Sequence, residues 1–257
     1  MGAYQGVMRT LNEDLLQRFC SHFFGYGTRD ARWVFLGMEE AGCRDQAEAK
    51  ARLNAWHNLN EGSLIQLSQF VNSLYELTAQ PQPTALKNKT WEFLIRIRLA
   101  AEGSTKPSKE SLFAFLRERL GDSSGETSLL EFMPLPCQGI KAWPWPQWCN
   151  VQRRKPSYVK QLAQLRIEKL QEIVGAKGNP RVVVFYGGAY AKYWLPIAGL
   201  DKMQVIPDFR PRAQWAGRDG KLFVSVFHPS YIRWCGVDPN TYATHLGVRI
   251  GSQYNGT

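Results

Sequence analysis

The fold of this chain is decided by the stretch Leu222-Phe223-Val224-Ser225-Val226-Phe227-His228-Pro229-Ser230, close to the end of its 257 residues. The mostly apolar run before the histidine predicts a buried strand. The strand must end at Pro229, because proline lacks the N–H that a sheet ladder needs. We therefore expect His228 to lie where a buried strand stops, at the rim of a cleft.

Three further apolar runs have the length and composition of buried strands: Trp33–Leu36, Ser128–Met133 and Val182–Tyr186. Segments with helical spacing separate the four runs, which is typical of a parallel sheet covered by helices on both faces. We predict an α/β fold with three layers, α/β/α, around a central, mostly parallel four-stranded sheet. The chain has no internal repeat and no low-complexity linker, so residues 1–257 are expected to form a single domain.

Composition limits the partners and the class of protein. The formal net charge of +10 favours a polyanionic partner such as nucleic acid. Five cysteines without a C-x-x-C pair argue against a zinc ribbon and against a disulfide-stapled secreted domain. No run approaches the length of a membrane span, and the first residues lack the apolar core of a signal peptide. We expect a cytoplasmic monomer that needs no metal or other cofactor and contacts no membrane.

Residues that could bind a ligand or take part in catalysis lie at the carboxyl ends of the predicted strands. In an open α/β sheet these ends meet in one crevice, which is where ligands bind. The residues are Glu39 and Glu40 after the first strand, Glu131 on the second, Gly187 and Gly188 after the third, and His228 after the last. The sequence therefore predicts that they share a site.

Taken together, these motifs resemble the uracil-DNA glycosylase superfamily. The family's first motif, a glycine followed by a polar or acidic pair and a small residue, is matched by residues 37–42, and its His-Pro-Ser motif by residues 228–230. Residues 183–192 resemble its strand-glycine-helix unit, and 129–132 lie where its base-reading strand lies. The resemblance spans about residues 33 to 234. It implies a monofunctional enzyme that flips a modified base out of double-stranded DNA, hydrolyses its N-glycosidic bond and leaves an abasic site.

The resemblance also implies catalytic roles. Glu39 occupies the acidic position of the first motif, where a carboxylate stabilises an oxocarbenium-like sugar and orients water. Glu40 is the alternative, since the alignment can slip by one residue. His228 would donate to the O2 atom of a pyrimidine and stabilise the departing anion. The simpler reading makes both glutamates ordinary acids at a helix start, and the histidine a strand-end residue bonded to backbone.

Glu131 departs from the family pattern, because many members read uracil with an asparagine on this strand. A protonated Glu131 could donate to N3 of a cytosine-type base and accept from its amino group, although it could serve uracil as well. With Phe132 and Met38, Glu131 is assigned to base binding. We expect a hypermodified cytosine, such as glucosylated hydroxymethylcytosine in phage DNA, which implies antiviral defence. The aromatic loop 143–148 could pack against the sugar of such a base. The alternative is repair of uracil or another deaminated base.

Residues around these motifs are candidates for contact with DNA. Side chains just after the His-Pro-Ser motif stand where the family inserts a wedge into the duplex, and the serine would bond a flanking phosphate. Glycines at a strand-to-helix turn let a phosphate approach, and a basic run could follow the backbone. The candidates are Ser230, Tyr231, Ile232, Arg233, Gly187, Gly188, Arg153 and Arg154.

Two readings from other classes stay open. One is a catalytically silent relative that recognises DNA with the same cleft. The other is a phosphate-binding α/β protein that acts on free nucleotides, although the glycine pattern at residues 187–188 is neither a dinucleotide fingerprint nor a P-loop. The family's iron–sulfur branch is excluded, because closely spaced cysteines are absent.

Overall fold

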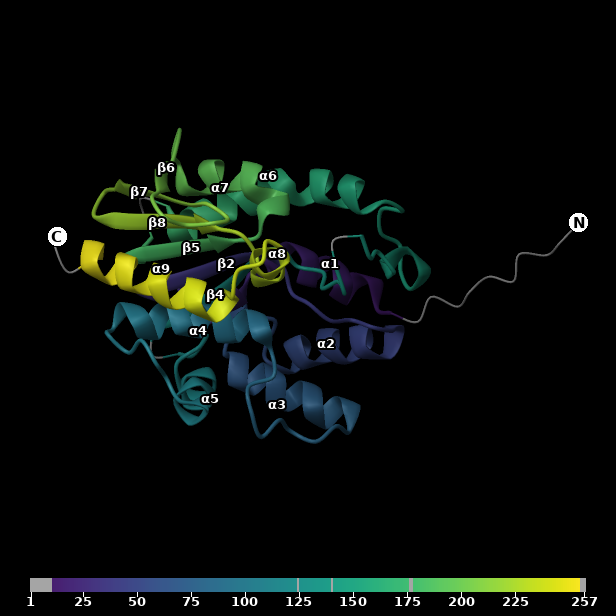
Figure 1. The fold of residues 1–257 in the computed structure, drawn as a ribbon. Coiled ribbons are helices and arrows are strands. Elements are labelled where there is room, and N and C mark those ends of the chain that lie inside the picture. The colour runs from purple at the N-terminus through teal and green to yellow at the C-terminus, as the bar shows by residue number, and fades with distance from the viewer. Residues whose placement is uncertain (1–10, 124, 140, 176–177, 255–257) are drawn as a thin grey trace, which may run out of the picture.

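A computed structural model describes residues 11–123, 125–139, 141–175 and 178–254. Within them, eight strands form one mixed, mostly parallel sheet in the order β3-β1-β4-β2-β5-β8-β7-β6 (Figure 1). The strands are β1 (Gly25–Tyr26), β2 (Trp33–Glu39), β3 (Leu64–Ile65), β4 (Thr127–Met133), β5 (Val182–Tyr186), β6 (Gln204–Ile206), β7 (Ala213–Arg218) and β8 (Lys221–Val226).

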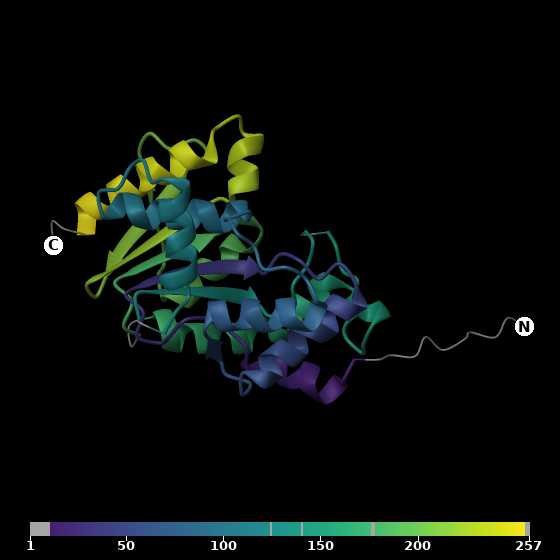
Figure 2. The ribbon, with the colours of Figure 1, turned by 90° about the horizontal axis from the view of Figure 1, so that it is seen from below.

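Helices flank the sheet on both faces, α6 and α7 on one and α4 and α9 on the other (Figures 1 and 2). The helices are α1 (Glu13–His22), α2 (Gln46–Asn58), α3 (Leu67–Thr78), α4 (Lys89–Ala101), α5 (Lys109–Glu118), α6 (Lys155–Val174), α7 (Ala191–Ala198), α8 (Pro229–Trp234) and α9 (Pro239–Tyr254). Two short 3-10 turns cover 145–147 and 188–190. None of the helices in the described ranges is long and apolar enough to cross a bilayer.

The four predicted strands form the parallel centre of the sheet, β4-β2-β5-β8. From β2 the chain continues to β4 on one side and later to β5 on the other. This reversal of direction opens a crevice beyond the carboxyl end of β2, where α/β sheets bind ligands. In the register, Gly37 pairs with Glu131. The fold thus brings residues 37–42 close to the end of β4.

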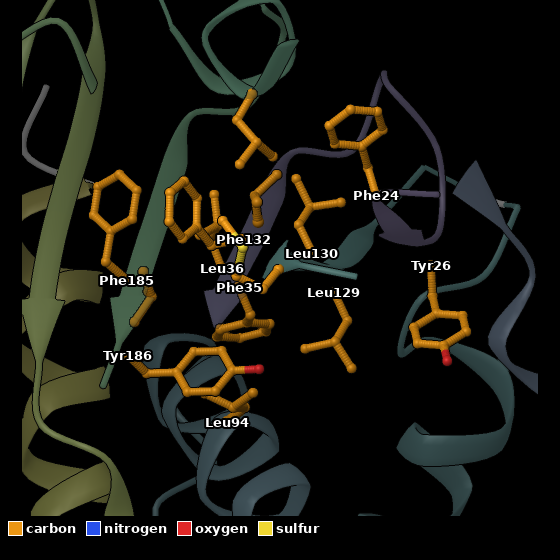
Figure 3. Packing of buried hydrophobic residues seen from close by; sticks show 14 of the residues in the cluster. Phe24, Tyr26, Phe35, Leu36, Leu94, Leu129, Leu130, Phe132, Phe185 and Tyr186 are labelled. Carbon is orange, nitrogen blue, oxygen red and sulfur yellow. The ribbon is translucent and has the colours of Figure 1, made fainter. Parts of the chain in front are cut away.

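The two faces of the central strands bury different residues, because successive side chains of a strand alternate. Phe132 and Phe185 lie on the side of α7, where Phe185 stacks on Trp194 at 5.3 Å between ring centres. Tyr186 lies on the opposite side with Leu94 of α4 (Figure 3). Glu131 precedes Phe132 by one residue and therefore shares the face of Tyr186.

The prediction of a four-stranded sheet was incomplete. Strands β7 and β6 extend it beyond β8 as antiparallel neighbours. Their residues are mostly polar or only partly buried, so no apolar run marks them. The last helix, α9, reaches Tyr254.

Candidate active site

A cavity of about 1210 Å³ opens at the carboxyl ends of β2, β4, β5 and β8. Its floor and walls come from these strand ends, from the first turn of α4, from α8 and from the loop around residues 137–142. Glu39, Glu40, Glu131 and His228 all line it. The residues that the sequence placed at four separate strand ends therefore share one cavity.

Glu39 is held by a lysine from a distant part of the chain. Lys155 Nζ lies 2.6 Å from Glu39 Oε1, and both side chains are at most 10% exposed. The other oxygen, Oε2, is buried and accepts no hydrogen bond from any described residue. Burial, the nearby Glu39 charge and a hydrogen bond to Glu39 raise the pKa of the Tyr190 hydroxyl. Lys155 and Tyr190 therefore both lie beside the Glu39 carboxylate.

Glu40 has a different environment. Its Oε2 accepts a hydrogen bond from the Tyr26 hydroxyl at 2.9 Å and pairs with Arg52 Nη1 at 2.8 Å. Arg52 also pairs with Glu48. Against the opposing effect of burial, hydrogen bonds from the backbone N–H groups of residues 44 and 43, together with the Arg52 charge, lower the pKa of Glu48 to about 2. Glu40 therefore belongs to a network that fixes α2 against the sheet.

Glu131 forms the floor of the cavity and is only 3% exposed. The Tyr186 hydroxyl donates to its Oε1 at 3.3 Å, while Oε2 has no partner among the described residues. Burial, followed by the charges of Glu40 and Glu39, raises the pKa of Glu131 well above its ordinary value. The site therefore favours the protonated carboxyl, a form that can both donate and accept a hydrogen bond.

The backbone beneath Glu131 is clamped by a buried arginine that sequence reasoning overlooked. Arg166 of α6 is fully buried and donates to the carbonyl oxygens of Glu131 (2.6 Å), Phe132 (2.8 Å) and Phe23 (2.6 Å). Its guanidinium lies 3.9 Å from the centre of the Phe24 ring. Burial lowers the pKa of Arg166 to about 10. These contacts fix the end of β4 and with it the position of the Glu131 side chain.

His228 caps α8 and faces the cavity with its other nitrogen. The Ser230 N–H approaches Nδ1 at 3.3 Å and the Ser230 hydroxyl lies 2.7 Å from it, so Nδ1 is an acceptor. The proton therefore belongs on Nε2, which lies 3.0 Å from Thr90 Oγ1. Burial lowers the pKa of His228, so the ring is neutral at physiological pH. A ligand can take the Nε2–H donor from Thr90.

Met38, Gly187 and Gly188 shape the wall between β2 and β5. Met38 is partly buried and lines the cavity. Gly187 has a φ of 110°, and a Cβ there would lie 2.8 Å from the Met38 side chain. A Cβ on Gly188 would lie 2.9 Å from the Phe227 ring. The glycines therefore make room for neighbouring side chains, and Gly188, which lines the cavity, is exposed.

Two predicted contacts are wrong because the side chains are buried elsewhere. Phe132 points to the α7 side, packs 4.6 Å from the Tyr193 ring and is 0% exposed, so it does not line the cavity (Figure 3). Ile232 is also 0% exposed, because it lies on the inner face of α8. It cannot act as a wedge in this conformation.

The aromatic loop also differs from expectation. Trp145 is 1% exposed and donates from Nε1 to the Pro136 carbonyl, and Trp148 packs against it at 5.5 Å. These rings fill the interior and offer no face to a sugar. The aromatic side chains at the cavity are instead Trp91, Tyr186, Phe227, Tyr231 and Trp234. They come from α4, from the ends of β5 and β8, and from α8, so no single stretch of sequence reveals them.

The remaining DNA-contact candidates lie on the surface. Ser230, Tyr231 and Arg233 are exposed on α8, and the first two line the cavity. Arg153 and Arg154 are exposed just before α6, outside the cavity. Their neighbour Lys155 turns inward to Glu39. That pairing links residues 116 positions apart, and no sequence signal could have revealed it.

A scan against protein-family models finds no match to this chain, and a search of curated proteins finds none either.

Proposed function

We propose that this protein is a DNA glycosylase, built like the uracil-DNA glycosylases as three α/β/α layers around a parallel four-stranded centre. It flips a modified base out of DNA, hydrolyses the N-glycosidic bond and leaves an abasic site. The proposal rests on the cavity at the strand ends and on the resemblance of its two motifs to that family.

One observation carries the proposal. Two carboxyl oxygens, Glu39 Oε2 and Glu131 Oε2, are buried beside the same cavity without a hydrogen-bond partner in the described chain. A buried polar atom left unpaired costs about 1–3 kcal/mol. Such atoms are tolerated where a ligand supplies the missing partner. A nucleotide flipped into the cavity would bring its base to Glu131 and its sugar to Glu39.

The chemistry follows from these positions. As the bond between the base nitrogen and C1′ breaks, its electron pair leaves with the base and positive charge develops on the sugar. The Glu39 carboxylate stabilises that charge, orients a water toward C1′ and accepts its proton. His228 Nε2–H donates to the base and stabilises the negative charge on it. Lys155 holds Glu39 in place and does not touch the substrate.

The raised pKa of Glu131 favours its protonated form, and that form suits a cytosine-type base. Its hydroxyl would donate to N3 and its carbonyl oxygen would accept from the exocyclic amino group. The cavity of about 1210 Å³ exceeds the roughly 300–1,000 Å³ of ordinary small-molecule sites. That space suits a base with a bulky substituent, such as glucosylated hydroxymethylcytosine in phage DNA. Antiviral defence is the corresponding role, and excision of uracil in repair is the alternative substrate reading.

The ion pairing of two of the three cavity glutamates, Glu39 and Glu40, favours a second candidate function. Lys155 and Arg52 offset the charges of Glu39 and Glu40, which would weaken stabilisation of a sugar cation. A protein that captures DNA in this cleft without cutting it would tolerate such pairing. It would bind the same flipped nucleotide and release nothing.

Strand-break assays separate these readings. The protein is incubated with duplexes that contain uracil, hypoxanthine or glucosylated hydroxymethylcytosine, and alkali then cleaves any abasic site. The proposal expects breaks at the modified cytosine, and expects the Glu39→Gln variant to be slower by about 10²–10⁴-fold.

The outcomes are distinct. Breaks at uracil alone would refute the cytosine reading of Glu131 but keep the glycosylase. Binding without breaks on any substrate, with equal affinity for wild type and Glu39→Gln, would favour the silent DNA-binding protein. Glu40→Gln is the matched control, because Glu40 is engaged by Tyr26 and Arg52.

A further inference from the structure

Three aromatic rings form a continuous stack from the cavity to the surface. Phe227 lies 4.6 Å from Tyr231 between ring centres, with 29° between the ring planes, and Tyr231 lies 5.5 Å from Trp234 at 32°. All three side chains line the cavity. The outermost, Trp234, is 78% exposed. We refer to Phe227, Tyr231 and Trp234 as the aromatic stack.

The exposure of this stack is unlike the rest of the described surface. The other large apolar side chains that are exposed there are aliphatic and lie on separate elements: Leu77, Leu165, Val205 and Val248. Apolar residues scattered singly need no explanation, whereas grouped ones mark interaction sites. Two exposed aromatic rings on one six-residue helix, beside a cavity, are such a group.

The helix that carries the stack is firmly anchored. Its first turn is capped by His228, and Ile232 is buried beneath it. It lies beside α4, which supplies another wall of the cavity (Figures 1 and 2). The helix backbone that carries Trp234 is therefore held in place beside the cavity, which lowers the entropic cost of stacking a ligand there.

Positive charge surrounds the cavity mouth. Lys87 and Lys89 are exposed on either side of the cavity-lining Asn88, and Lys141 lines the opposite loop. Arg233 is exposed on α8 itself. Lys89 pairs with Glu92, so some of this charge is offset locally. An aromatic face flanked by lysines and arginines fits a polyanion that also carries flat rings.

We propose that the aromatic stack is a platform for single-stranded nucleic acid, on which a base beside the one in the cavity stacks against Trp234. The rings are too close to admit a base between them, so the added base lies on the outer face of Trp234. In an intact duplex both faces of each base are covered by the neighbouring bases. An unpaired strand can present the face of a base to Trp234 without first being unstacked from a duplex. The platform binds the strand whether or not a base is excised.

Binding of unmodified oligonucleotides tests this directly. Fluorescence anisotropy of labelled single strands and of the matching duplex gives both affinities for wild type, Trp234→Ala and Trp234→Phe. We expect the single strand to bind more tightly than the duplex. Trp234→Ala should lose about 5- to 150-fold in single-strand affinity, as expected for one stacked base. Trp234→Phe should recover most of it, and Leu77→Ala, exposed on α3, should change nothing.

Several results would overturn the platform. These are a duplex that binds as tightly as the single strand, Trp234→Ala with wild-type affinity, or Trp234→Phe as weak as the alanine variant. Light scattering tests whether a second copy of this chain occupies the aromatic stack instead. A wild-type dimer that Trp234→Ala converts to a monomer, with unchanged DNA affinity, would assign the stack to that second copy. None of these readouts depends on excision, so failure of the platform and failure of the glycosylase are distinguishable.

Discussion

At the scale of single residues, Glu131 defines the site, because it is a buried acid whose Oε2 atom has no hydrogen-bond partner among the described residues. Tyr186 donates to the other oxygen, and burial together with the charges of Glu40 and Glu39 raises the pKa of the carboxyl. In its neutral form this carboxyl is both donor and acceptor. Glutamine has the same shape and the same two functions at every pH, so it serves as the diagnostic substitution.

Glu131→Gln should change the pH dependence of stability. The raised pKa means that, as pH rises above about 4.5, the unfolded chain loses a proton that the folded chain keeps. The free energy of unfolding then falls with pH, by up to about 1.4 kcal/mol per pH unit from this group, until the folded pKa is reached. Urea denaturation from pH 5 to 8 should show this decline in wild type and a weaker one in Glu131→Gln. Identical slopes would mean that Glu131 ionises normally.

Lys155→Met should separate catalysis from binding. It leaves Glu39 without the contact that orients it, so the single-turnover excision rate should fall about a hundredfold. The affinity for DNA should hold within about twofold, because Lys155 is buried. Arg154→Met is the matched control, because Arg154 is the exposed neighbour of Lys155. Its loss should change the affinity for DNA and the salt dependence of binding but not the excision rate. A reversed pattern would place Lys155 on the DNA backbone.

At the scale of elements, the carboxyl end of β2 depends on a glycine. Gly37 pairs with Glu131 in the register, and a Cβ there would lie 2.4 Å from the Tyr186 hydroxyl and 2.7 Å from Glu131 Oε2. Any side chain at this position would push both groups out of place. The glycine of the first motif therefore makes the floor of the cavity possible.

Gly37→Ala should consequently lower the free energy of unfolding by about 1–3 kcal/mol, the usual cost of overpacking a core. Chemical denaturation measures it. Gly217→Ala on β7 is the control, since the nearest atom to an added Cβ is 3.9 Å away. Equal stability of the two variants would show that β2 and β5 separate easily, and that the floor is not rigid.

At the scale of the whole molecule, apolar runs predicted the centre of the sheet, because buried parallel strands are continuously hydrophobic. They could not predict β6 and β7, whose edge positions tolerate residues such as Gln204 and Gln214. The glutamates and the histidine could be placed because strand ends converge. Lys155 could not, since the ion pair that turns it inward depends on how α6 packs against the end of β2.

The net charge of +10 predicts that binding of nucleic acid depends on salt concentration. If the four cations around the cavity mouth each neutralise a phosphate, the logarithm of single-strand affinity should fall with the logarithm of salt concentration with a slope of about −3. Lys141→Ala should reduce the magnitude of this slope by about 0.7. Binding titrations from about 50 to about 300 mM salt, roughly around the physiological range, measure the slope for wild type and for Lys141→Ala. A slope near zero would remove nucleic acid as the partner.

The most direct test of the central claim is mass-spectrometric detection of the released base. Single-turnover reactions would contain excess protein and an oligonucleotide with one glucosylated hydroxymethylcytosine or one uracil. We predict that wild type releases the free modified base and leaves one abasic site per base, whereas Glu39→Gln does so far more slowly. Intact nucleotide after prolonged incubation with protein that still binds the oligonucleotide would contradict the assignment of Glu39 and His228 to glycosidic bond cleavage.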